Sequence, residues 1–207
     1  MHKHCDKLTA NPLMALLVGG TGSGKTYLLF QMLTTPNILD YERLIILTTT
    51  PDQVYFQFLK HGYENNLRKS IINKLFELYT NSDIKSDIAE ICSQTAKVSG
   101  CTQPNPIQVV LTREITNLEQ LNPHMLKTLV IFDDCVTERN QSAQSDIFTK
   151  GRHMNCHSIY LTQSFYDVKK SYAKMPTCLY FSNRMTKASL VFYKALRQAC
   201  PKTTLKS

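Results

Sequence analysis

Short runs of hydrophobic residues alternate along this chain with longer segments in which hydrophobic positions recur every three or four residues. The short runs predict buried strands, and the periodic segments predict helices. Strands are expected at residues 13–18, 43–49, 107–112, 128–132, 158–162 and 178–182. Helices are expected at residues 25–33, 53–60, 64–79, 142–150 and 186–198. This alternation is typical of an α/β domain with a mainly parallel sheet and helices on both of its faces.

Local signals set some of these boundaries. The first helix should stop ahead of Pro36, because the residue before a proline disfavours helix. Gly151 is placed to cap the helix at 142–150, and Thr186 can cap the start of the last helix. In the 64–79 helix, one face is predicted to carry four hydrophobic residues: Leu67, Ile71, Leu75 and Leu78. The polar stretch 80–105 is expected to be a loop or insertion, with at most a short helix at 84–92.

Composition places the chain among single-domain proteins that do not enter membranes. Its 207 residues contain no repeat or linker, so residues 1–207 are expected to form one domain. No hydrophobic run approaches the roughly 20 residues that a membrane-spanning helix needs. The start of the chain lacks the hydrophobic segment of a secretory signal, and the seven cysteines show no C-x-x-C pair. These features favour a reducing cytosol or nucleus and argue against secretion.

Charge is distributed unevenly along the chain. The net charge is +8, and residues 151–207, a basic C-terminal quarter, hold ten Lys and Arg residues against one acid, Asp167. Residues 1–150 are nearly neutral. A basic segment of this kind favours a polyanionic partner. A solvated basic surface that aids solubility explains the same charge, so both interpretations stay open on charge alone.

A phosphate-binding motif follows the first expected strand and precedes the first expected helix, which is the context that it requires. Glycines let successive backbone N–H groups turn toward an anion, and the helix N-terminus adds its positive dipole end. Lys25 would place its charge on the β- and γ-phosphates, and the Thr26 hydroxyl can bind Mg²⁺. The sequence therefore predicts a nucleotide-binding P-loop formed by Gly19, Gly20, Thr21, Gly22, Ser23, Gly24, Lys25 and Thr26.

Polar residues follow two later strands. Asp133 ends the hydrophobic run at 128–132 and should emerge at the sheet edge where α/β proteins bind ligands, which favours a role in metal binding. Asp134 fits a general base that orients water, although an N-cap or loop carboxylate is the alternative. Gln163 ends the strand at 158–162. It either senses the γ-phosphate or is an ordinary strand-end amide.

The combined pattern resembles a known family. The segments G-G-T-G-S-G-K-T, L-V-I-F-D-D and G-R-H-M-N-C-H-S-I-Y-L-T-Q-S-F-Y-D-V look like those of the poxvirus-type DNA-packaging ATPases, members of the FtsK–HerA superfamily of P-loop translocases. The R-H pair followed by a strand ending in Thr-Gln-Ser-Phe-Tyr is the most specific piece. The likeness covers residues 13–196 but is thin between 53 and 125.

This resemblance implies a RecA-like core in which the Gln163 strand lies between the P-loop strand and the Asp133 strand. It also implies a homo-oligomeric ring that hydrolyses ATP with Mg²⁺ and moves double-stranded DNA, without sequence preference, into a capsid. A capsid or portal protein would be a partner. The protein would then be found in the virion or in the host cytoplasm or nucleus. Arg152 stands where the family motif has its arginine, so it is expected to reach a neighbour's site. A contact with its own helix end or with DNA is the alternative.

One departure and two alternatives qualify this interpretation. The superfamily usually has Asp-Glu where this chain has Asp133-Asp134, so the assignment of Asp134 as base is the less secure of the two. A nucleoside or nucleotide kinase would fit the size and the early P-loop, but only three widely spaced arginines lie in the C-terminal quarter. A nucleotide-gated DNA-binding structural protein with weak hydrolysis is the second alternative. A GTPase is disfavoured because no N-K-x-D motif is present.

Overall fold

A parallel sheet forms the centre of the protein in the computed structural model, which describes residues 13–83, 86–100, 107–114, 126–135, 141–163 and 177–180. Within this part of the chain six strands pair in the order β3-β2-β4-β5-β1-β6, and every pairing is parallel. The strands are β1 (Met14–Val18), β2 (Arg43–Thr48), β3 (Gln108–Thr112), β4 (Thr128–Asp133), β5 (Cys156–Thr162) and β6 (Thr177–Tyr180). The six expected strands are confirmed to within two residues wherever both of their ends lie in the described part of the chain.

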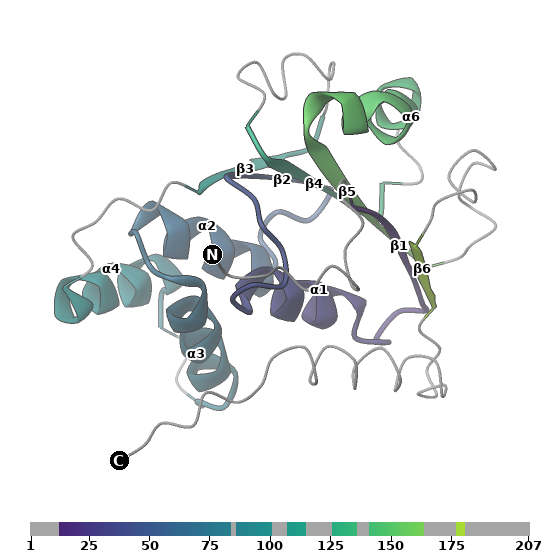
Figure 1. Ribbon diagram of the computed structural model, residues 1–207. Coiled ribbons are helices and arrows are strands. Elements are labelled where there is room, and N and C mark those ends of the chain that lie inside the picture. Colours follow the sequence, from purple (N-terminus) through teal and green to yellow (C-terminus); the bar gives the residue numbers. More distant parts are fainter. Residues whose placement is uncertain are drawn as a thin grey trace.

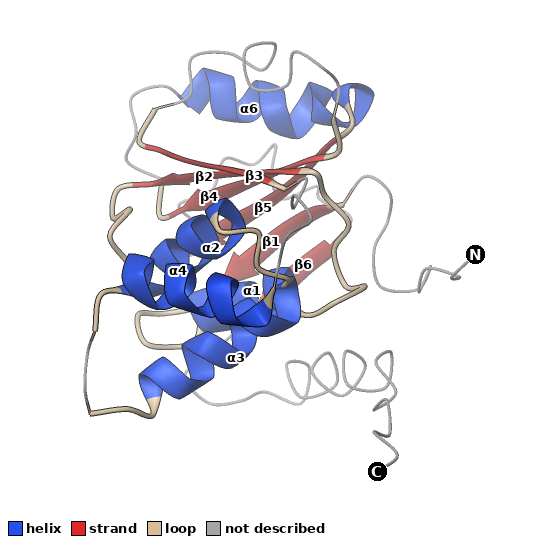
Figure 2. Ribbon diagram, turned by 90° about the vertical axis from the view of Figure 1, so that its left-hand side faces the viewer, coloured by secondary structure: helices blue, strands red, loops and turns tan. Residues whose placement is uncertain are grey.

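Helices cover both faces of the sheet. They are α1 (Lys25–Thr34), α2 (Val54–Glu64), α3 (Lys69–Thr80), α4 (Ile88–Ser99) and α6 (Gln141–Lys150), followed by the short 3₁₀ helix η1 (Gly151–Met154). Helices α1 to α4 lie on one side of the sheet and α6 lies on the other (Figure 1). The view turned by 90° separates the same layers (Figure 2). The predicted α/β architecture is therefore confirmed.

Two hydrophobic clusters hold these layers together. On the α1–α4 side, the Phe76 ring of α3 packs against Phe30 of α1, 4.5 Å between centroids, and against Phe58 of α2 at 5.8 Å. On the α6 side, Phe132 stacks on Tyr160 at 5.5 Å in a cluster that includes Ile147. Every residue of β4 is buried, as a central strand covered on both faces requires.

The inward face of α3 differs from the predicted one. Ile72 and Phe76 are its buried residues, and Leu78 is 60% exposed. Leu67 is buried, but it lies in the turn before α3, which begins at Lys69 rather than at residue 64. Two neighbouring stripes on this helix both show three-to-four spacing, and packing of Phe76 into the α1–α2 groove selects the one that faces the sheet.

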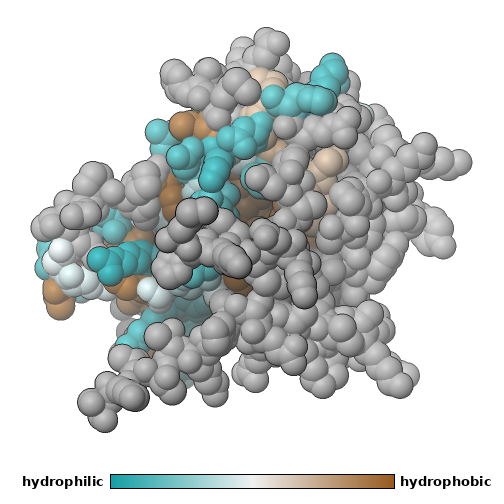
Figure 3. All heavy atoms as spheres, viewed as in Figure 1, coloured by the Kyte–Doolittle hydropathy of each residue, from teal (hydrophilic) through white to brown (hydrophobic). Residues whose placement is uncertain are grey.

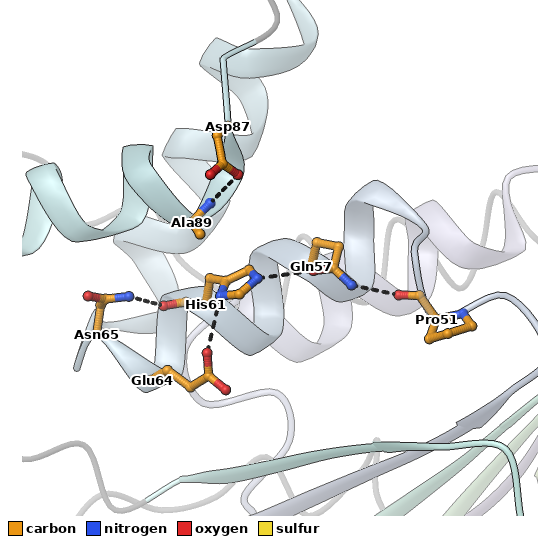
Figure 4. Close-up of polar contacts among 7 residues, drawn as sticks. All are labelled: Pro51, Gln57, His61, Glu64, Asn65, Asp87 and Ala89. Carbon is orange, nitrogen blue, oxygen red and sulfur yellow. Dashed lines mark hydrogen bonds and ion pairs between the residues drawn. The ribbon is translucent and has the colours of Figure 1, made fainter.

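Residues 80–105 were expected to be a loop or insertion, and this expectation is wrong for most of the described part. Helix α4 occupies twelve residues there, beginning at Asp87, whose side chain accepts the Ala89 N–H at 3.1 Å, and ending at Gly100 with φ +59°. Figure 4 shows this cap together with the contacts at both ends of α2, where Gln57 donates to the Pro51 carbonyl and Asn65 donates to the His61 carbonyl. Capping therefore defines a helix that buries only Cys92.

Gly151 does not cap α6 as predicted. The chain continues from α6 into η1, and the residue with left-handed backbone is Asn155, φ +55°. Gly151 is buried, and a Cβ there would lie 3.3 Å from the Cβ of Cys156. Close packing against the start of β5 therefore accounts for this glycine. The expected helix at 186–198 lies outside the described residues.

The described surface mixes hydrophilic and hydrophobic residues in the view of Figure 3. Four large hydrophobic residues are exposed in the described part of the chain, namely Tyr27, Val54, Leu78 and Val98. No helix among the described residues is long and hydrophobic enough to cross a membrane.

Candidate active site

The residues singled out from the sequence meet at one edge of the sheet, with one exception. Because all strands are parallel, the carboxyl ends of β1, β4 and β5 lie together. The P-loop follows β1, Asp133 ends β4, and Gln163 follows β5. Strand β5 lies between β1 and β4, as the resemblance implied. This order brings the phosphate-binding loop next to the two acidic residues.

The P-loop has the backbone that its glycines permit. Gly22 and Gly24 have φ values of +75° and +85°, which L-residues with side chains rarely adopt. Gly24 is the N-cap of α1, and its carbonyl accepts the Leu28 N–H at 2.9 Å. The first turn of α1 therefore opens into the loop, and its free N–H groups and positive dipole end favour an anion there.

Lys25 lies over this loop. Its Nζ donates to the carbonyl oxygen of Gly19 and to that of Gly20, the latter at 3.1 Å. Burial lowers the pKa of Lys25, while the charges of Asp134 and Asp133 oppose that shift. The ammonium group is thus partly buried between the loop and two carboxylates.

Asp133 is a buried carboxylate, 7% exposed, at the end of β4. Its Oδ2 accepts a hydrogen bond from Thr48 Oγ1 at 3.0 Å and a longer one from Gln53 Nε2 at 3.4 Å. Burial raises the pKa of Asp133, and the hydrogen bond from Thr48 acts against this. A carboxylate that is buried but held by donors is suited to bind a cation.

Asp134 differs from its neighbour in exposure and backbone. It is exposed and has φ +53°, an uncommon value for a residue other than glycine. Its N–H donates to the Leu161 carbonyl of β5 at 3.3 Å. This left-handed backbone is sparsely populated by such residues, and functional sites are where it tends to persist.

Gln163 links the two halves of the site. Its Nε2 donates to Asp134 Oδ2 at 3.0 Å, and its Oε1 accepts from Thr21 Oγ1 of the P-loop at 3.2 Å. Its amide is therefore held in one orientation by a loop residue on one side and an acid on the other. This contact pattern exceeds that of an isolated strand-end amide.

Sequence reasoning missed two residues of this site, Thr48 and Gln53. Thr48 is fully buried at the end of β2, and Gln53 is the N-cap of α2. The run Thr48-Thr49-Thr50 after a hydrophobic strand was an available signal. Its meaning depends on β2 pairing with β4, and strand order is not visible in the sequence.

Arg152 is the exception at the sheet edge. Its backbone lies in η1, directly before β5, whereas Gln163 directly follows β5. The seven residues of β5 separate the two positions by about 20 Å, at roughly 3.3 Å per residue. That distance exceeds the reach of an arginine side chain, so Arg152 cannot complete the site of its own chain.

The site residues fit a magnesium–nucleotide pair. Ser23 Oγ is buried in the P-loop without a hydrogen-bond partner among the described residues, so a polar ligand would satisfy it. The described residues contain no group of three or more His, Cys, Asp and Glu side chains that could hold a metal alone. Magnesium bound with a nucleotide needs only one or two protein carboxylates, because phosphates and water supply the other oxygens.

Comparisons with known proteins give two structural similarities. No protein-family model matches the chain, and no curated protein matches its sequence. The genome packaging NTPase B204 of Sulfolobus turreted icosahedral virus 2 is similar at 16% identity and a TM-score of 0.42, over 95% of this chain and 90% of that one. The ATPase domain of a replicative helicase is similar at 12% identity and a TM-score of 0.44, over 92% and 67%. Strand order, P-loop and acidic strand end together make the fold that of a RecA-like P-loop NTPase.

Proposed function

We propose that this protein is an ATPase motor that moves double-stranded DNA into a capsid. The observation that carries the proposal is the meeting of Lys25, Asp133, Asp134 and Gln163 at one sheet edge. Binding, metal-holding and water-orienting groups are all needed for hydrolysis of a phosphoanhydride. A kinase would instead have to place an acceptor hydroxyl, and an exposed acid–amide pair suits a small nucleophile such as water.

Each group has a role in this proposal. The P-loop N–H groups and Lys25 bind the phosphates, and Ser23 Oγ gains a partner there. Thr26 and Asp133 hold Mg²⁺, which neutralises charge on the phosphates when bound. Asp134 accepts a proton from the attacking water, and Gln163 orients that carboxylate. Because Gln163 also contacts Thr21, its orientation responds to changes in the P-loop.

Assembly into a ring is part of the proposal. Arg152 lies at the sheet edge opposite its own P-loop, so it can serve only a neighbouring subunit or another ligand. In a ring it would stabilise charge on the neighbour's transferred phosphoryl group. The basic C-terminal quarter supports contact with DNA phosphates, and capsid delivery rests on the resemblance in the sequence motifs.

Phosphate release measured with and without duplex DNA tests the proposal. Turnover should require Mg²⁺, increase with DNA, and lose its DNA response at high salt, because phosphate contacts release counterions. Lys25→Ala should reduce turnover to background. Lys150→Ala is the matched control, since Lys150 is an exposed lysine on α6 paired with Asp146. Wild-type turnover in Lys25→Ala would refute the site, and transfer of phosphate to nucleosides would favour a kinase.

A further inference from the structure

The turn between β2 and α2 contributes to the candidate site although no sequence motif marks it. Strand β2 pairs with β4 so that Thr48 lies directly beside Asp133. Gln53, at the start of α2, also reaches that carboxylate. A third strand end therefore contacts the acid that the proposed function assigns to magnesium.

The two oxygens of Asp133 have different surroundings. Both Thr48 and Gln53 donate to Oδ2. Among the described residues, none donates a hydrogen bond to Oδ1. One oxygen is thus fixed by the protein, and the other has its acceptor sites available for a cation.

The orientation of Thr48 is itself fixed. The Thr50 N–H donates to Thr48 Oγ1 at 3.1 Å, so the hydroxyl oxygen already accepts a hydrogen bond and its hydrogen can go to Asp133. Gln53 Nε2 also donates to Thr50 Oγ1, which ties the start of α2 to the same turn. Thr48 is fully buried, so water does not replace it as donor.

We propose that Thr48 is a positioning residue that holds Asp133 by one oxygen so that the other binds Mg²⁺, with Gln53 as a second, weaker donor. This inference rests on the proposed function. Partners that orient a metal-binding carboxylate commonly contribute on the order of 10- to 100-fold in metal affinity. Loss of the Thr48 hydroxyl should therefore weaken magnesium binding without disturbing the P-loop, which contacts phosphate independently.

The test compares Thr48→Val, Thr48→Ser and a control, Thr128→Val. Thr128 is also fully buried, but it lies at the opposite end of β4 and donates to the Leu126 carbonyl. Binding of a fluorescent ATP analogue is measured in EDTA and then during Mg²⁺ titration. Thr48→Val should bind the analogue like wild type in EDTA, and its Mg²⁺ midpoint should rise about 10-fold. Thr48→Ser should restore the midpoint, and Thr128→Val should leave it unchanged.

An unchanged Mg²⁺ midpoint in folded Thr48→Val, beside a magnesium-dependent wild type, would overturn this inference alone. A wild-type protein that binds no analogue would overturn the proposed function with it. Circular dichroism checks folding of each variant. If Thr48→Val does not fold, Gln53→Met decides: a raised midpoint supports the positioning role of this turn, and a wild-type midpoint refutes it.

Discussion

At the scale of single residues, a polar cluster inside the α1–α4 layer combines a lysine with two tyrosines. Lys69 Nζ donates to the Leu39 carbonyl at 2.7 Å and lies 4.1 Å from the centroid of the Tyr41 ring. The Tyr41 hydroxyl donates to the Leu33 carbonyl and contacts the Tyr63 hydroxyl, each at 2.9 Å. Burial lowers the pKa of Lys69 to about 8 and raises the pKa values of both tyrosines.

This cluster predicts how stability depends on pH. Between pH 8 and pH 10 the folded protein has lost the Lys69 proton while the unfolded chain, with a lysine pKa of roughly 10.4, keeps it. The unfolded state then binds more protons, so the Lys69 contribution to the free energy of unfolding rises with pH, by at most about 1.4 kcal/mol per pH unit. Urea unfolding of wild type and Lys69→Met at several pH values isolates this contribution. Identical pH slopes in the two proteins would contradict it.

The residues of the candidate site divide by what a sequence can show. The P-loop, Asp133, Asp134 and Gln163 could be singled out because each stands in a motif or at a strand end. The Gln163 bridge between Thr21 and Asp134 could not be, since it depends on side-chain orientation. Thr48 was missed because its role depends on which strand pairs with β4.

At the scale of elements, the strands and α1 were predictable because their hydrophobic runs are long and bounded by glycine, proline or acidic residues. Helix α4 was not predicted because it buries only Cys92, so its hydrophobic pattern is weak. Its signals were Asp87 at the start and Gly100 at the end, which mark a helix independently of burial. The face of α3 was misassigned because two stripes share the same spacing.

A glycine inside α2 predicts an unusual substitution effect. Alanine normally stabilises a helix interior relative to glycine, by about 1 kcal/mol. At Gly62, however, a Cβ would lie 2.6 Å from Cγ1 of Ile72, a fully buried residue of α3. Overpacking typically costs about 1–3 kcal/mol, so Gly62→Ala should lower the free energy of unfolding by roughly 1 kcal/mol.

Chemical denaturation of Gly62→Ala, Ile72→Ala and the double variant checks this. The double variant should lose less stability than the two single losses added together, because truncating Ile72 removes the clash. Additive losses, or a Gly62→Ala protein more stable than wild type, would show that α2 and α3 separate freely at this contact.

At the scale of the whole molecule, the two edges of the sheet have different contents. The carboxyl edge holds the P-loop, the acids and Gln163, and the opposite edge holds the backbone of Arg152. A single chain therefore has a nearly complete hydrolytic site and an arginine placed too far away to join it. Head-to-tail contacts between copies would bring one edge to the other, which is the geometry of a closed ring.

The account's central claim, a site completed by a neighbouring subunit, is tested most directly by mixing two inactive variants. Arg152→Ala subunits keep the P-loop and both acids, and they should bind ATP but hydrolyse it slowly, since the arginine acts on charge in the transition state. Lys25→Ala subunits have an inactive site but can supply Arg152. ATPase activity is measured after co-assembly, with mixed assembly confirmed by mass. The double variant Lys25→Ala/Arg152→Ala replaces Lys25→Ala in the control. The account predicts that the first mixture recovers part of the activity and the control mixture none. Background activity in both, with mixed assembly confirmed, would contradict it.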